Sequence, residues 1–399
     1  MNKKHHYNLS SQYISKNVEQ LKLSAIKEMA MLSAKIDNVA CLTWGLPSFR
    51  TPEVIRNIVK QQLEQDADIG KYALPDGLKE LRQLVAEKHF KETDIKVDPD
   101  ENVMITSGNM QGMNTVLHTI IDPGDEIILT DPCFTSHIQQ VKQYAGVPVY
   151  WQLDEENDWA LDVEHLPTLI TEKTKAIVIV SPSNPTGKIF TKTNLLRIGE
   201  IAKQHGLLII IDDPYSHFIY DNQEKYFNLA SVENLFDNIV YCYTFSKAHA
   251  MSGWRLGYMI LPEDLKRKAL IVHDLAVLCT PRISQVAGIA VLNSDQRYIP
   301  RFQEILSSRR DLICQRLDAL PHVFEYNKPE GAYYVFPKIL IEHDNTHDFS
   351  VQLLNQAKVS VTPGSAFGPS GDKHIRMAYC IDEDTINLAF DRMEKYFGK

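Results

Sequence analysis

Short runs of β-branched and other apolar residues recur along the chain, separated by stretches with helical spacing. The strand-like runs lie at residues 103–106, 126–130, 175–180, 207–211, 238–243 and 257–261. They are apolar on both faces, which is typical of strands buried inside a mostly parallel sheet. Helical spacing between them is clearest at 110–120 and 195–206. This alternation predicts an α/β fold in which helices cover both faces of the sheet, giving a three-layer αβα domain.

The chain is too long for a single core of this kind. It has 399 residues, whereas one core stops growing at roughly 250 to 300. Near residue 295 the pattern changes to a long charged helix through 319, a strand at 333–336 and a final helix from 383. We therefore predict a large domain at 45–294 and a smaller α+β domain formed by 1–44 and 295–399.

Charge and spacing exclude several classes of partner. The 42 Lys and Arg residues against 51 Asp and Glu give a net charge of −9, which lacks the basic excess that nucleic-acid binding requires. No apolar run approaches the roughly 18 residues of a membrane span, and the first residues are too polar for a signal peptide. We expect no nucleic-acid partner, no membrane partner and a cytoplasmic location. The six scattered cysteines and 14 histidines show no ligand spacing, so we expect no metal site.

Polar clusters follow four of the predicted strands, where ligands gather in sheets of this type. Ser107, Gly108 and Asn109 precede a helix whose N-terminus could hold an anion such as phosphate. A capped helix start would explain the same residues. Further along, Asn184 stands between two prolines. A rigid turn accounts for the prolines but not for the asparagine.

The other two clusters carry charge. Asp212 and Asp213 end an apolar strand and are followed by Tyr215, and two such acids are costly unless a cation lies nearby. An N-cap aspartate would explain only one of them. The next strand leads to Thr244, Lys247 and then Arg255. A lone lysine would be a solvated charge, but the combination in one loop indicates a site.

Taken in order, these clusters resemble the class I/II aminotransferases, the pyridoxal-phosphate enzymes of fold type I typified by aspartate and aromatic aminotransferases. The most informative motifs are Asn184-Pro185-Thr186-Gly187, and Ser246-Lys247 followed by Gly253-x-Arg255. The resemblance spans nearly the whole chain, from Ser24 to Arg376. It implies pyridoxal 5′-phosphate as cofactor, amino acid and 2-oxo acid substrates exchanged by a ping-pong cycle, and a homodimer with shared active sites.

The resemblance also assigns roles to individual residues. Lys247 matches the Schiff-base lysine, and Asp212 matches the acid that pairs with the pyridine nitrogen. Tyr215 and Asn184 match the donors to the ring hydroxyl oxygen. Further positions match the phosphate site of the family: Ser107, Gly108, Asn109, Thr244 and Arg255, with Tyr72 from the second subunit. Phe134 matches the aromatic residue that stacks on the ring. The residues that match the substrate carboxylate site are Gly45, Asn184 and Arg376. Thr244 departs from the usual serine but keeps the hydroxyl.

Several alternatives stay open at this level. The same fold and cofactor serve C–S lyases, decarboxylases and cyclopropane-forming synthases, and a pyridoxal-phosphate-sensing regulator would need more than the roughly 20 residues that precede the match. The sequence does not indicate which substrate side chains the protein prefers. Arg282 is either a reader of the substrate side chain or a solvated arginine at a helix start. Trp44 and Phe49 either line an apolar pocket or pack in the interior.

Overall fold

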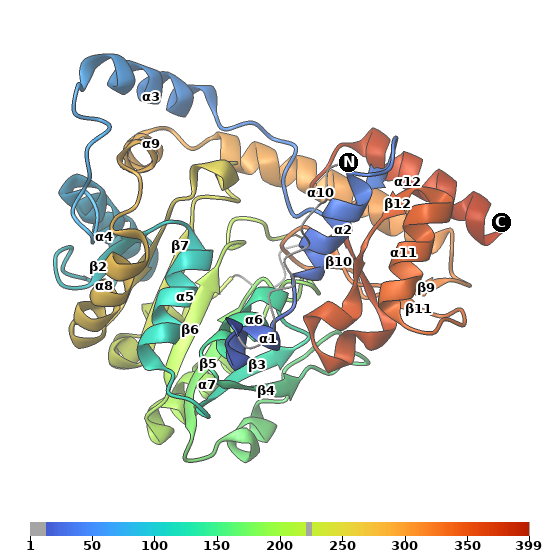
Figure 1. Cartoon of the computed structure of the whole chain (residues 1–399), viewed down its shortest axis with the longest axis horizontal. Helices are drawn as coiled ribbons and strands as arrows, with labels where there is room; N and C mark the ends of the chain where they lie inside the picture. The colour runs from blue at the N-terminus through green and yellow to red at the C-terminus, as the bar shows by residue number, and fades with distance from the viewer. Residues whose placement is uncertain (1–12, 221–225, 399) are drawn as a thin grey trace, which may run out of the picture.

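The main sheet of the molecule has seven strands in the order β2-β8-β7-β6-β5-β3-β4 (Figure 1). The computed structural model describes residues 13–220 and 226–398, so residues 1–12 of the predicted small domain lie outside the described residues. The strands of this sheet are β2 (Val103–Thr106), β3 (Glu126–Asp131), β4 (Val147–Gln152), β5 (Thr174–Val180), β6 (Leu208–Asp213), β7 (Ile239–Thr244) and β8 (Gly257–Ile260).

All six predicted strands are present, and the mostly parallel arrangement is confirmed. Neighbouring strands from β4 to β7 pair in parallel, while β8 runs antiparallel to both β2 and β7. The sequence pattern did not predict β4. This strand lies at the edge of the sheet and only Trp151 in it is buried, so it lacks the doubly apolar pattern of the central strands.

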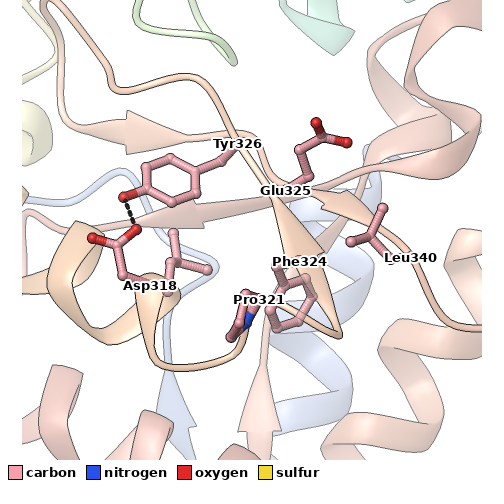
Figure 2. Close-up of a pocket in the computed structure, with 7 residues that line it drawn as sticks. Asp318, Pro321, Phe324, Glu325, Tyr326 and Leu340 are labelled. Atoms are coloured by element: carbon pink, nitrogen blue, oxygen red, sulfur yellow. Dashed lines mark hydrogen bonds between the residues drawn. The ribbon is translucent and has the colours of Figure 1, made fainter.

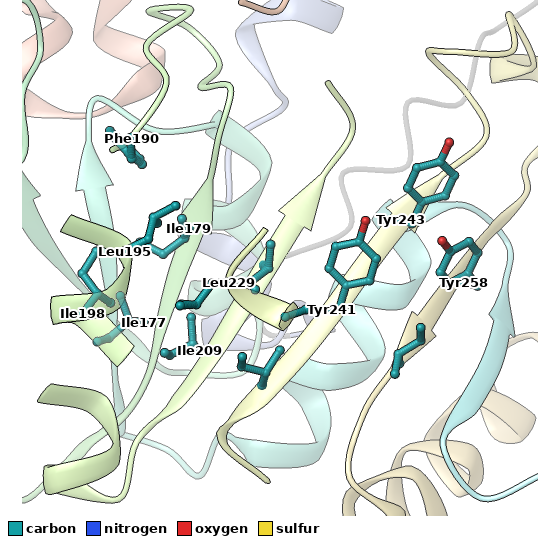
Figure 3. Packing of buried hydrophobic residues seen from close by; sticks show 14 of the residues in the cluster. Ile177, Ile179, Phe190, Leu195, Ile198, Ile209, Leu229, Tyr241, Tyr243 and Tyr258 are labelled. Carbon is teal, nitrogen blue, oxygen red and sulfur yellow. The ribbon is translucent and has the colours of Figure 1, made fainter. Parts of the chain in front are cut away.

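Helices cover both faces of the sheet, which confirms the three-layer prediction. Successive residues of β5 point to opposite faces: Ile177 and Ile179 pack toward α4, α7 and α9, as Figure 3 shows in part, whereas Ala176 and Val178 pack toward α5, α6 and α8. The covering helices are α4 (Lys79–Thr93), α5 (Asn109–Ile120), α6 (Thr135–Gln143), α7 (Lys192–His205), α8 (Glu263–Val277) and α9 (Arg282–Asn293), with α3 (Glu53–Gln65) outside α9.

A second hydrophobic core joins the end of the chain to residues near its start. Ala40 and Leu42 pack with residues from 306 to 393, and β1 pairs with β12 in parallel. The long helix predicted at 295–319 is α10 (Tyr298–Asp318), and only Tyr334–Val335 of the strand predicted at 333–336 is paired. The division of the chain at residues 44 and 294 stays a prediction.

The elements of this second region are short strands among long helices, as Figure 1 shows beside the main sheet. Its strands are β1 (Ala40–Cys41), β9 (Phe324–Glu325), β10 (Tyr334–Val335), β11 (Lys338–Ile339), β12 (Val359–Ser360), β13 (Thr362–Pro363) and β14 (Ile375–Ala378). Its helices are α2 (Ala25–Ser33), α10, α11 (Thr346–Ala357) and α12 (Glu383–Phe397), whereas the short α1 (Lys16–Glu19) lies against α6 beside the main sheet. Among the described residues, no helix is long and apolar enough to cross a membrane.

The second core meets the main sheet at the carboxyl ends of the parallel strands. Tyr215 follows β6, yet it belongs to the same buried cluster as Tyr334 of β10. Asp212 and Thr244 end β6 and β7 on this side. The fold therefore gathers side chains from both cores around one edge of the sheet.

Candidate active site

Lys247 lies in the loop after β7, where the two cores meet. Its Nζ donates a hydrogen bond to the carbonyl oxygen of Gly45 at 2.9 Å. Burial lowers the pKa of Lys247 from its ordinary value of 10.5 to about 8, and the positive charges of Arg376 and Arg255 act in the same direction. An amine with this pKa is about one-tenth neutral at pH 7, far more than an ordinary lysine, and the neutral form is the nucleophile.

Asp212 is held on both of its carboxylate oxygens. Its Oδ1 accepts from Asn109 Nδ2 at 2.7 Å, and its Oδ2 lies 3.1 Å from Nε2 of the buried His137. The Nδ1 of His137 is buried with no partner among the described residues, which favours the tautomer with its proton on Nε2 facing the carboxylate. Asp212 is thus a fixed anion that can pair with a cationic ring nitrogen.

His137 is a residue that the sequence reasoning missed. It lies on the first turn of α6, three residues after Phe134, and the two rings meet edge to face with centroids 5.3 Å apart. Spacing of three residues on a helix was the available signal, because it places both side chains on one face. Phe134 was predicted, but its contact partner His137 was not, because only the packing of α6 on the sheet brings that side chain to Asp212.

The start of α5 forms a cradle for an anion. Gly108 is the N-cap residue and no side chain caps this helix end, so its first N–H groups are available. Gly108 has φ +77°, and an added Cβ would lie within 2.5 Å of Arg255 Nη2. Arg255 also donates to Ser107 O at 3.4 Å. The hydroxyl of Thr244 donates to that of Ser246 at 2.9 Å. A guanidinium, hydroxyls and a helix N-terminus together suit a phosphate group.

These groups fit pyridoxal phosphate. The cradle supplies cationic and neutral donors for a phosphate, Asp212 supplies an anion for the ring nitrogen, and Lys247 supplies an amine for the aldehyde. Two polar atoms at the same edge, Thr106 Oγ1 and Asn109 Oδ1, are buried with no partner in the described part of the chain. Both atoms lie close to Gly257, where an added Cβ would come within 3.0 Å of each, so the base of the cradle leaves room only for glycine.

Arg376 on β14 is fully buried and faces the same region. Its Nη1 donates to Asn184 Oδ1 at 3.0 Å and its Nη2 to Thr43 O at 2.6 Å. The guanidinium carbon lies 4.3 Å from the ring centroid of Tyr334. A Cβ at Gly45 would clash with the Tyr334 hydroxyl. The planar guanidinium is thus fixed in place, as bidentate recognition of a carboxylate requires.

A group of tyrosines completes the site, and two of them were not predicted. The hydroxyl groups of Tyr215 and Tyr334 lie 2.9 Å apart, and Tyr333 donates to Gly45 O at 3.2 Å. Burial raises the pKa of Tyr215 well above its ordinary value, so its hydroxyl keeps its proton and can donate. The apolar context of Tyr333 and Tyr334 in the sequence had indicated a strand rather than a site.

Four residues considered from the sequence as parts of the site are exposed or contact other residues in this structure. Tyr72 is 80% exposed. Arg282 forms an ion pair with Asp66 at 3.2 Å. Phe49 stacks on Phe302 with centroids 4.0 Å apart, as the packing alternative expected. Trp44 lies at the surface, with Lys27 Nζ 4.5 Å from its ring centroid.

Two surface hollows in the second region are lined by none of the predicted site residues. The one in Figure 2, of about 370 Å³, lies between the end of α10 and strands β9 and β11, where Tyr326 donates to Asp318. The other, of about 590 Å³, lies between α11 and the end of α12. Within residues 13–220 and 226–398, no group of His, Cys, Asp or Glu is placed to hold a metal.

Comparison with known proteins gives one consistent result. Residues 38–393 match the family model of aminotransferase class I and II. The chain is 34% identical to an aspartate aminotransferase of Pyrococcus abyssi and 34% identical to an aromatic-amino-acid aminotransferase of Thermococcus litoralis, each time over 96% of this chain and 97% of the relative. A mutant aspartate aminotransferase of Thermus thermophilus has a similar structure, with a TM-score of 0.89 at 29% identity over 96% of this chain and 99% of that one.

The lowered pKa of Lys247 gives a pH prediction for the cofactor-free protein. Amine reagents attack the neutral form, so modification of Lys247 should accelerate as pH rises through about 8 and then level off. Peptide mapping after timed exposure to the reagent at each pH would measure this. Exposed lysines in the same digest are the control and should titrate near 10.4. A midpoint for Lys247 near that of the exposed lysines would contradict the proposed environment.

Proposed function

The chain belongs to the class I and II aminotransferase family, and on that premise we propose that Lys247 both bonds the cofactor and moves the proton of the reaction. The chain is a pyridoxal-phosphate-dependent aminotransferase. The observation that carries the proposal is the Lys247 amine, which is held 2.9 Å from Gly45 O and whose pKa is lowered to about 8 by burial and by the charges of Arg376 and Arg255.

Residues at the carboxyl ends of the parallel strands, and Tyr215 of the second core beside them, would hold the cofactor in this proposal. Ser107, Gly108, Asn109, Thr244 and Arg255 bind the phosphate, and Phe134 lies against the ring. Asp212 binds the ring nitrogen, while Tyr215 and Asn184 donate to the ring hydroxyl oxygen. When bound, pyridoxal phosphate supplies an electron sink for the bonds of the substrate α-carbon. Asp212 favours the protonated ring nitrogen because an anion within hydrogen-bond distance stabilises that charge.

Lys247 and Arg376 act on the substrate. Arg376, with Gly45 and Asn184 beside it, binds the α-carboxylate and so orients the bond from the α-carbon to its hydrogen. The Lys247 amine takes the proton from the α-carbon and returns a proton at the end of the transfer, as general base and then general acid. The donor amino acid would leave as its 2-oxo acid before a second 2-oxo acid enters, and its amino group would be held by bound pyridoxal phosphate between the two, so we propose ping-pong kinetics.

The family assignment decides between the enzyme alternatives left open by the sequence. The relatives are named as aspartate and aromatic aminotransferases, so transamination replaces the lyase, decarboxylase and synthase alternatives and the sensing regulator. Those names also indicate which donors to test first, namely acidic and aromatic amino acids. We also propose a cytoplasmic location, which the free thiols of all six cysteines favour because reducing compartments keep cysteines unpaired.

We propose a homodimer in which each subunit completes the other's site. Exposed apolar side chains support it: Leu275 on α8 is 82% exposed, and Ile271 and Leu278 beside it are also exposed. Tyr72 is exposed in a neighbouring segment, which an ion pair from Lys266 of α8 to Asp76 holds near this helix. Exposed apolar side chains along one helix favour burial against a second copy.

Replacing the proposed catalytic amine tests the central assignment. Lys247→Ala should lower kcat by at least about 10²-fold, because a positioned proton-transfer group alone is worth that much. Steady-state kinetics with glutamate as donor would measure the loss. Borohydride reduction of the wild-type holoenzyme, followed by peptide mapping, should attach the cofactor to Lys247. The matched control Lys60→Ala, on the exposed face of α3, should behave as wild type, and a cofactor-bearing peptide from any other lysine would refute the assignment.

The two arginines should respond differently to substitution. Arg376→Ala should lower kcat/KM for every donor by about 30-fold or more, because loss of one partner of a buried charge pair costs about 2 to 5 kcal/mol. Arg376→Lys keeps the charge but loses the planar guanidinium, so it should recover only part of the lost kcat/KM.

If Arg282 binds a distal carboxylate of the substrate, Arg282→Ala should lower kcat/KM for glutamate but leave kcat/KM for phenylalanine and alanine within about threefold of wild type. Equal losses for all three donors in Arg282→Ala would remove it as a specificity residue.

If two subunits share their active sites, two damaged variants should complement each other in a mixed dimer, which a monomeric enzyme could not do. Tyr72→Ala and Lys247→Ala should each be weakly active alone, because each homodimer has two damaged sites. Coexpression of the two should restore about a quarter of wild-type activity, since half of the dimers are mixed and each mixed dimer has one intact site. Purification on two different tags would isolate the mixed dimer for assay. Absence of restoration in that fraction would mean that Tyr72 serves its own chain.

A further inference from the structure

Four polar side chains form a hydrogen-bonded chain behind the loop that carries Lys247. His217 Nε2 and His249 Nε2 each lie 3.1 Å from the hydroxyl of Tyr243. His249 Nδ1 lies 2.7 Å from the hydroxyl of Tyr298. We call these four residues the histidine–tyrosine clasp.

The members of the clasp come from three separate parts of the fold. His217 lies two residues after Tyr215, in the segment that follows β6. His249 lies two residues after Lys247, in the segment that follows β7, and Tyr243 belongs to β7 itself. Tyr298 is the first residue of α10. The clasp thus joins the two segments that carry the site to each other and to the long helix of the second core.

The centre of the clasp is buried, while His217 and Tyr298 at its two ends are partly exposed. His249 is fully buried and Tyr243 nearly so. Burial lowers the pKa of His217 to about 4 and that of His249 well below its ordinary value, so both rings are neutral. A neutral imidazole has one N–H and one bare nitrogen. The single Tyr243 proton can therefore donate to one histidine while the oxygen accepts from the other, and every link is satisfied at once.

In the part of the chain that the structure describes, aromatic rings and one lysine surround Tyr243 at the centre of the clasp. Tyr243 stacks on Tyr258 with ring centroids 5.0 Å apart, and both residues are labelled in Figure 3. Phe245 contacts the same ring edge to face, and Lys88 Nζ lies 4.0 Å from the Tyr243 ring centroid. A shift of the Lys247 loop would leave buried nitrogen or hydroxyl groups unpaired, which costs free energy.

We propose that the histidine–tyrosine clasp is a positioning device that fixes Lys247 relative to Tyr215 and Asp212. The proposal rests on the function proposed above for Lys247. No member of the clasp is assigned contact with substrate or cofactor, so the four are positioning residues. Their effect is on geometry, and a displacement of about 1 Å at a reacting atom can cost 10²-fold in rate.

Tyr243→Phe tests the clasp with one atom removed. The ring still packs on Tyr258 and Phe245, but both histidines lose their shared hydroxyl. We expect kcat of the holoenzyme to fall by about tenfold with KM for the amino acid within about threefold, because the reacting geometry changes while the Arg376 site does not. The visible circular dichroism of the bound cofactor should change as well, since it reports how the site holds the cofactor.

Tyr258→Phe is the matched control. It makes the same chemical change on the ring stacked against Tyr243, and the Tyr258 hydroxyl is buried with no partner among the described residues. Its kcat, KM and circular dichroism should match those of wild type. Equal behaviour of Tyr243→Phe and Tyr258→Phe would overturn the proposal. A Tyr243→Phe variant that loses only thermal stability, with wild-type kcat per bound cofactor, would also overturn it.

Substitutions at His249 provide a second test if Tyr243→Phe does not fold. His249→Gln places an amide where Nε2 was and keeps a bond to Tyr243, whereas His249→Phe keeps only the aromatic packing. We expect His249→Gln to stay within about threefold of the wild-type kcat and His249→Phe to lose about tenfold. Equal kcat in both variants would overturn the proposal. Lys247→Ala, assayed in parallel, separates failure of the clasp from failure of the proposed function. If Lys247→Ala stays active, the role proposed for Lys247 is wrong. If Lys247→Ala is inactive but the clasp variants keep the wild-type kcat, only the proposal for the clasp is wrong.

Discussion

Burial of a lysine amine at the junction of two cores is the constraint on which the site depends. A charged ammonium loses hydration there, so its pKa falls, and the fold must supply other groups to keep the amine oriented. Gly45 from the N-terminal segment accepts its hydrogen bond, and Arg376 from β14 adds positive charge nearby. Neither group belongs to the main sheet. The reactive lysine comes from one core, and the surroundings that make it reactive come largely from the other.

The sequence predicted those parts of this arrangement that depend on local pattern. The six central strands were predicted because they are buried on both faces, and Asp212, Thr244 and Lys247 were predicted because they follow such strands. The edge strand β4 was missed because its exposed positions break the pattern. The resemblance to a family added the roles of Arg376, Asn184 and Tyr72, which no local pattern would have connected with Lys247.

The residues that escaped prediction act through contacts between distant segments. His137 reaches Asp212 from α6, and Tyr334 reaches Tyr215 from β10. Each looks like an ordinary helix or strand residue, since only the packing of one element against another decides its partner. The same holds for His249, which looks like a neighbour of Lys247 until the fold brings Tyr243 and Tyr298 to its two nitrogens.

Helix α10 connects these contacts over a long distance. It has 21 residues, so it spans about 30 Å at 1.5 Å per residue. Its first residue is bonded to His249, and farther along Arg309 donates to Ser48 while Leu317 packs in the second core. A helix of this length behaves as a stiff rod. A displacement of the second core relative to the main sheet would therefore have to be taken up by bending of α10 or by the hydrogen bond between Tyr298 and His249, two residues from the reactive amine.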